Sequence, residues 1–108
     1  MAFFVLLTDS AALDLEELYD YIRHHDAATK TEYILDHIEK IFNNLSKMPE
    51  LGAFPKELLK LGVREYREIY FKPYRIIYRI KKRSVYILLI ADGRRDIEVL
   101  LQRRLLEA

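Results

Sequence analysis

The apolar residues between positions 34 and 48 constrain the fold of this chain more than any other feature. They follow one another at steps of four, three, four and three residues, and a proline comes next at position 49. The stripe consists of Ile34, Ile38, Ile41, Leu45 and Met48. Such steps place every member on one face of an α-helix, and a proline ends a helix because its ring clashes with the preceding turn. The pattern therefore predicts a long helix that must bury one side against another layer of structure.

A strand and a first helix are predicted before this stripe. Residues 3–7 form a short apolar run, which is typical of a buried strand. Asp9 or Ser10 is expected to cap a helix whose periodic apolar face reaches Ile22. The polar residues 24–26 interrupt the periodicity, so we expect the two helices to form an antiparallel hairpin.

The second half of the chain predicts a sheet. Alternating or fully apolar runs are bounded by turn residues, and the last run is apolar on both faces, so its strand should be central. The expected elements are a loop at 49–62, strands at 63–71, 74–80 and 85–91, a four-residue hairpin loop at 81–84, and a short amphipathic helix at 97–105. The order β-α-α-β-β-β-α predicts a single α+β domain over residues 1–108, with the helical hairpin packed on a mostly antiparallel four-stranded sheet.

Charge is distributed unevenly along the chain. Residues 1–54 hold four basic and ten acidic side chains, a balance of −6, whereas residues 55–108 hold fourteen and seven, a balance of +7. The basic half should attract an acidic partner or nucleic acid. The absence of cysteine excludes disulfides and thiol chemistry. The apolar start is too short for a signal peptide or a membrane span, so we expect a cytoplasmic protein that has no membrane partner.

Arginines gather on the predicted strands and on the loop that follows them. A guanidinium stays charged and offers a planar fork of donors, which suits phosphates and carboxylates. The candidate target-binding residues are Arg67, Arg75, Arg79, Arg94 and Arg95. An alternative is that Arg75 and Arg79 lie across the sheet and pair with Glu65 or Glu68. The three histidines lack the spacing of metal ligands, so neither a metal nor a cofactor is predicted.

Several segments in this order resemble the RelE/ParE superfamily of bacterial toxins from type II toxin–antitoxin systems. The resemblance covers nearly the whole chain. It rests on residues 15–22, 45–49, Gly52, 64–67, 74–79, 93–96 and 100–105. It implies a small protein that arrests growth, that functions in plasmid stabilisation, and that is neutralised by a cognate antitoxin. The expected antitoxin segment is short, acidic or amphipathic, and folds over the helical hairpin and the sheet as it binds.

The superfamily divides by target, and this sequence favours one branch. RelE-like toxins cut messenger RNA on the ribosome, whereas ParE-like toxins inhibit DNA gyrase. Arg75 and Arg95 match nuclease arginines, but Tyr66 and Glu68 stand where nucleases carry lysines, and Leu101 stands near the expected tyrosine. We therefore expect a ParE-like gyrase inhibitor that has no catalytic residues of its own. Two alternatives remain open: a ribosome-dependent endoribonuclease using Arg75, Arg95, Lys56 and Lys60, or an inactive relative that binds an antitoxin.

Overall fold

The computed structural model describes residues 2–25 and 28–107. Its strands are β1 (Phe4–Leu7), β2 (Tyr66–Phe71), β3 (Tyr74–Lys81) and β4 (Ser84–Asp92). Its helices are α1 (Asp9–His25), α2 (Ala28–Lys47), the 3-10 helix η1 (Pro49–Leu51), α3 (Lys56–Leu59) and α4 (Ile97–Glu107). The predicted α+β order is confirmed. The loop predicted at 49–62 contains two short helices, η1 and α3. Among the described residues, no helix combines the length and apolar character that crossing a bilayer requires.

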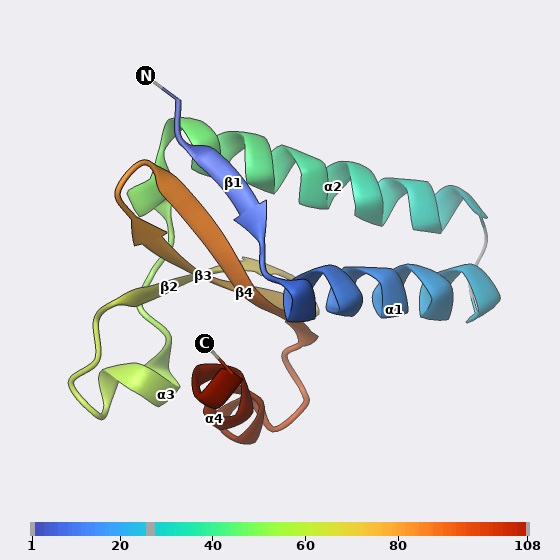
Figure 1. Ribbon diagram of the computed structural model, residues 1–108. Coiled ribbons are helices and arrows are strands. Elements are labelled where there is room, and N and C mark those ends of the chain that lie inside the picture. Colours follow the sequence, from blue (N-terminus) through green and yellow to red (C-terminus); the bar gives the residue numbers. More distant parts are fainter. Residues whose placement is uncertain (1, 26–27, 108) are drawn as a thin grey trace.

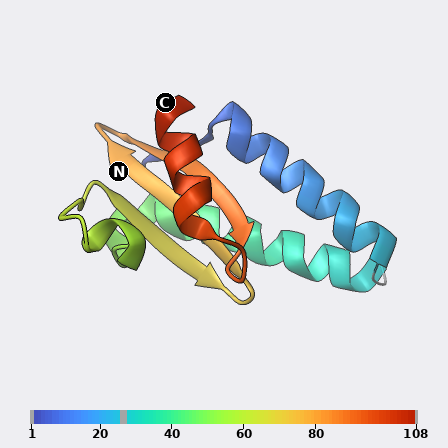
Figure 2. The ribbon, with the colours of Figure 1, turned by 90° about the horizontal axis from the view of Figure 1, so that it is seen from below.

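The four strands form one sheet in the order β1-β4-β3-β2. β1 pairs with β4 in parallel, and the other two pairs are antiparallel, so the prediction of a mostly antiparallel sheet with a central last strand is confirmed. Figure 1 shows α1 and α2 on one face of the sheet, with α3 and α4 on the other. In the view from below, α4 crosses over β4 (Figure 2).

The sheet separates two apolar clusters. The cluster under α1 and α2 includes Ile34, Ile38 and Leu45 from the predicted stripe, packed on Ile76 and Tyr78 of β3. The cluster on the opposite face is closed by α3 and α4, and its members are Leu58, Tyr66, Ile77, Leu88, Leu89, Ala91, Ile97 and Leu101. Both faces of the sheet are therefore buried along most of β3 and β4, which explains the apolar run from Ile87 to Ala91.

A bulge in β4 directs two consecutive residues to the same cluster. The register pairs Ile77 with Leu89 and Tyr78 with Ile87, so Leu88 is the extra residue. Beyond Ile87 there is no β1 backbone beside β4, since β1 pairs only as far as this residue. Side chains take the place of the missing strand: Arg104 donates to the Leu88 carbonyl at 3.0 Å, and Asp14 accepts from the Ile90 amide at 3.0 Å.

Asp14 and Arg104 also bind each other. Two hydrogen bonds of 2.5 and 2.7 Å join the guanidinium to the carboxylate, and both side chains are largely buried. The pair ties α1 and α4 to the part of the β4 edge that β1 does not cover.

Four local predictions near element ends were wrong. β1 is an edge strand rather than a buried one, because only one side has a neighbour, and Phe4 is 68% exposed. The α1 cap is Thr8, whose hydroxyl accepts from the Ala11 amide. Met48 lies beyond the end of α2 and is exposed. The β3–β4 turn holds two residues rather than four, because Lys82 adopts a left-handed φ of 57° that closes the hairpin tightly.

Candidate functional site

The loop that joins β4 to α4 carries two of the predicted target-binding arginines. Gly93, Arg94, Arg95 and Asp96 lie between the two elements, and we call these four residues the arginine loop. The loop approaches the β2–β3 turn closely, because a Cβ on Gly93 would lie 2.7 Å from the Tyr70 hydroxyl and 3.2 Å from the Pro73 carbonyl. A glycine is needed at this position to allow that approach.

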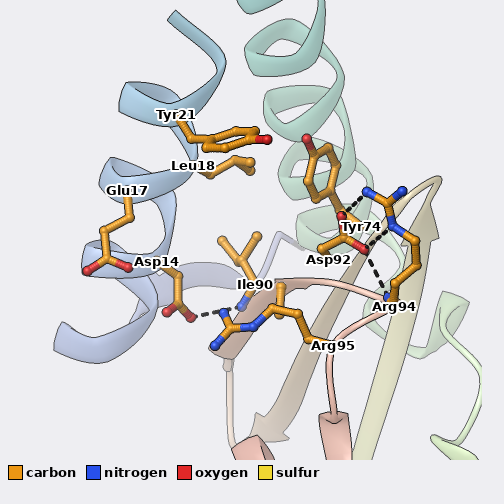
Figure 3. Close-up of a pocket in the computed structure, with 10 residues that line it drawn as sticks. Asp14, Glu17, Leu18, Tyr21, Tyr74, Ile90, Asp92, Arg94 and Arg95 are labelled. Carbon is orange, nitrogen blue, oxygen red and sulfur yellow. Dashed lines mark hydrogen bonds and ion pairs between the residues drawn. The ribbon is translucent and has the colours of Figure 1, made fainter. Parts of the chain in front are cut away.

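A hollow of about 550 Å³ lies beside the arginine loop, between α1 and the adjoining ends of β3 and β4. Tyr21 from α1 and Tyr74 from β3 project into it from two sides (Figure 3). Both loop arginines line it, and so do three carboxylates. These carboxylates belong to Asp14, Glu17 and Asp92. The hollow thus combines an aromatic wall with charges of both signs.

Asp92 holds Arg94 in one orientation. The carboxylate accepts hydrogen bonds from the Arg94 Nε at 2.9 Å, from its Nη2 at 2.6 Å and from its backbone amide at 2.9 Å (Figure 3). These bonds lower the pKa of Asp92 to about 2. The Arg94 side chain is nevertheless 82% exposed. It is therefore oriented by the protein and still accessible to a partner.

Arg95 differs from its neighbour because, among the described residues, no carboxylate is hydrogen-bonded or ion-paired to its guanidinium. Within the described part of the chain, its side chain makes no hydrogen bond or ion pair, and the residue is exposed. It lines the hollow beside α1 and also a second hollow of about 430 Å³, between α3 and the start of α4. A cation in this position can bind an external anion without first breaking an internal pair.

The second hollow contains every residue of the nuclease alternative. Lys56, Lys60, Arg75 and Arg95 all line it. Lys60 pairs with Glu98 at 2.9 Å. Acidic groups of Glu57, Asp96 and Glu98 face the same hollow, so its charges are largely balanced.

Arg75 is buried in an internal triad with two carboxylates. Its side chain is 5% exposed and donates to Glu57 through Nη1 and Nη2, both at 2.8 Å, and to Glu68 through Nε at 2.6 Å. The hydrogen bonds to Arg75 lower the pKa of Glu57, and the same bonds raise the pKa of the guanidinium. The structure contains the pairing with Glu68 that the sequence offered as an alternative. Glu57 was missed because helix α3, which carries it, was predicted only as a loop.

Arg67 supports the chain around η1. It donates to the carbonyl oxygens of Gly52 at 2.9 Å and Glu50 at 3.3 Å, and it lies 4.6 Å from the centre of the Phe54 ring. The buried Tyr78 hydroxyl assists from β3 by accepting from the Gly52 amide at 2.9 Å. Burial raises the pKa of this tyrosine. Arg67 therefore stabilises a turn and does not join the arginine loop.

Arg79 lies near the β3–β4 turn, at the opposite end of β3 from the arginine loop. It pairs loosely with Glu65 at 3.6 Å, and its guanidinium lies 5.9 Å from the centre of the Tyr66 ring. The five predicted target-binding arginines thus do not form one surface. Arg94 and Arg95 are neighbours in the arginine loop, and the buried Arg75 lines one hollow with Arg95. Arg67 and Arg79 lie elsewhere on the sheet. Each histidine bonds a carbonyl one turn earlier in its own helix. No group of three potential metal ligands occurs among residues 2–25 and 28–107.

The chain matches known toxins in sequence and in fold. The family described as the ParE toxin of the type II toxin–antitoxin system parDE matches residues 5–97. Toxin ParE3 of Caulobacter vibrioides is 28% identical over 100 residues, which cover 93% of this chain and 96% of that protein.

Solved structures share the fold at lower identity. A chain of the chromosomal ParDE system from P. aeruginosa has a TM-score of 0.67 at 21% identity, covering 84% of this chain and 96% of that one. A mutant of the E. coli toxin RelE in the free state has a TM-score of 0.64 at 16% identity, covering 95% and 98%. The family match spans most of the chain, including the β4–α4 loop and its two arginines. The chain therefore belongs to the ParE toxin family of type II toxin–antitoxin systems, within the RelE/ParE superfamily.

Proposed function

We propose that this toxin arrests growth in the bacterial cytoplasm by inhibiting DNA gyrase, and that it binds gyrase through the arginine loop. The observation that carries the proposal is the burial of Arg75 between Glu57 and Glu68. A nuclease needs this arginine to stabilise the negative charge that develops on a scissile phosphate. Here the guanidinium is already neutralised, and the neighbouring carboxylates would repel a phosphate.

The arginine loop supplies the accessible cations that the triad does not. Arg94 is oriented by Asp92 but exposed, and Arg95 has no ion-pair partner within the described residues. The adjacent hollow offers Tyr21 and Tyr74, so a partner side chain can be held by aromatic and charged contacts together. Clusters of arginine and tyrosine are the usual anchors of protein interfaces.

A DNA cleavage assay tests the proposal. Purified gyrase is incubated with supercoiled and relaxed plasmid, with and without the toxin, and scored for lost supercoiling and for trapped double-strand breaks. The wild-type toxin should trap breaks, and the double variant Arg94→Glu/Arg95→Glu should not. The matched control is Lys40→Glu/Lys47→Glu, which makes the same change of charge on the exposed surface of α2 and should behave as wild type. Unimpaired inhibition by the arginine variant would contradict the proposed surface.

An endoribonuclease is the second candidate, because Lys56, Lys60, Arg75 and Arg95 line one hollow. If the chain cuts messenger RNA on the ribosome, transcripts mapped after induction will contain codon-specific breaks. If gyrase is inhibited and transcripts remain intact, this candidate is removed.

The proposed antitoxin covers apolar surface that the isolated chain leaves exposed. Side chains of this kind occur on β1, where Phe4 and Leu6 are exposed, and on the helical hairpin, where Leu13 and Tyr33 are exposed. A segment that folds on binding can bury both surfaces together. Expression of the chain alone should stop growth, and co-expression of the antitoxin should restore it. Normal growth with the chain alone would instead favour an inactive relative.

A further inference from the structure

The β3–β4 turn carries a second basic surface, at the opposite end of β4 from the arginine loop. We define the hairpin surface as Arg79, Lys81, Lys82, Arg83, Ser84 and Tyr86 together with Thr8 and Tyr66 beside them. A hollow of about 560 Å³ is lined by these residues, apart from Arg83, and by Leu88. β4 has nine residues, so the two basic surfaces are roughly 25–30 Å apart. In Figure 1 the turn and the β4–α4 connection lie at opposite ends of β4.

The hairpin surface differs from the other two hollows in its charges. Its lining contains three cations and no carboxylate, whereas each of the others includes at least three acidic residues. Lys81, Lys82 and Arg83 are exposed, and among the described residues none of them has an ion-pair partner. Only Arg79 has one, the exposed Glu65 at 3.6 Å. The described residues therefore neutralise little of the positive potential at this turn.

The remaining lining groups suit phosphate oxygens better than a protein side chain. Thr8, Tyr66, Ser84 and Tyr86 bring hydroxyls beside the cations. Hydroxyls, lysines and arginines are the side chains that contact the phosphates of nucleic acids. A protein partner would instead need a desolvated pocket for an apolar or aromatic anchor. The one apolar residue of this hollow, Leu88, is almost completely buried.

The same surface offers only one exposed ring to an unpaired base among the described residues, that of Tyr86 at 36% exposure. Tyr66 is buried, and Arg79 lies close to its ring. Base stacking on an exposed aromatic ring is what proteins use to hold single strands. Contacts limited to the backbone do not depend on sequence and are available on a duplex.

We propose that the hairpin surface binds the phosphate backbone of duplex DNA. This deepens the proposed function and rests on it for its biological role, since gyrase acts on DNA and the two basic surfaces can contact enzyme and DNA at once. The DNA contact itself requires no gyrase and is measured without it.

Fluorescence anisotropy with a labelled 20-base-pair duplex of arbitrary sequence tests the contact. The toxin is titrated alone, at salt concentrations between 50 and 200 mM. The test variant is Lys81→Gln/Lys82→Gln, and the matched control is Lys40→Gln/Lys47→Gln on α2. Circular dichroism and thermal melting check that both variants keep the wild-type fold.

Each phosphate contact contributes about 0.9 to the slope of log K against log salt. The test variant should bind about tenfold or more weakly at 50 mM, with a slope shallower by about 1 to 2. The control should bind as wild type.

Three results would overturn the proposal. The wild-type toxin could fail to bind the duplex at 50 mM salt, the two variants could lose affinity equally, or labelled polyglutamate could bind through Lys81 and Lys82 while the duplex does not. The outcomes also separate this inference from the gyrase proposal. Trapped breaks without DNA binding by the toxin would contradict the hairpin surface alone. DNA binding without any effect on gyrase would contradict the proposed function alone.

Discussion

Replacement of Arg75 by methionine distinguishes a structural arginine from a target-binding one. The change removes three hydrogen bonds of 2.6 to 2.8 Å and leaves two carboxylates facing each other, with side chains only 13% and 15% exposed. Removal of one partner from a buried ionic network costs about 3–5 kcal/mol, because the remaining charge is uncompensated. For a chain of this length the loss corresponds to a fall in Tm of about 12–20 °C.

The loss of unfolding free energy in Arg75→Met depends on pH, because it depends on the negative charge of the two buried carboxylates. In the wild type the lowered pKa of Glu57 means that its contribution to stability is present above its ordinary pKa and is lost as the pH falls through the lowered value. In Arg75→Met the carboxylates lack a cation, so burial and repulsion between them raise the pKa of Glu57, and its protonation relieves that repulsion. The difference in unfolding free energy between the two proteins should therefore be largest near pH 7 and narrow below about pH 5.

Urea unfolding followed by circular dichroism, at pH 7 and at pH 4.5, measures this difference. The triple variant Arg75→Met/Glu57→Leu/Glu68→Leu serves as the compensated control, because an apolar replacement of a whole buried network is often neutral. It should recover unfolding free energy to within about 1 kcal/mol of the wild type. It should also still trap breaks with gyrase. A triple variant that folds but has no effect on gyrase would refute the reasoning, since Arg75 would then contribute to target binding directly.

Two further predictions concern the other charged pairs. Arg104→Met leaves the Asp14 carboxylate without its counterion and the Leu88 carbonyl without its donor, so it should lower the free energy of unfolding by about 3–5 kcal/mol, measured by urea titration. An unchanged midpoint would show that the pair does not stabilise α4. An NMR titration of the Asp92 carboxyl should give a midpoint near 2, and Arg94→Gln should return it toward the ordinary value of about 4. A midpoint near 4 in the wild type would contradict the bonding to Arg94.

Periodicity in the sequence predicted the elements well, because burial of a helix face or a strand face leaves a regular trace. The stripe from Ile34 to Leu45 and the apolar run of β4 both became core. Features that depend on neighbours from distant segments left no such trace. β1 is as apolar as a central strand, yet only its pairing shows that it is an edge. The bulge at Leu88 changes which face of the sheet the β4 residues beyond it point to. The two side chains that hydrogen-bond to the β4 edge there, Asp14 and Arg104, lie 90 residues apart in the sequence.

The same limit explains why the arginines could not be sorted from the sequence. Whether an arginine binds a target or supports the fold depends on whether a carboxylate or carbonyl from another element reaches it. Arg75 is neutralised by Glu57 from α3, Arg104 by Asp14 from α1, and Arg67 by carbonyls near η1. Arg95, Lys81 and Lys82 have no such group within the described residues. An unneutralised exposed cation contributes little to folding, and its charge is available to an external anion. Other exposed basic residues, such as Arg64, Lys72 and Arg103, also have no ion-pair partner among the described residues. In the arginine loop and the hairpin surface the cations line hollows together with tyrosines, so the exposed lysines of α2 serve as matched controls for charge alone.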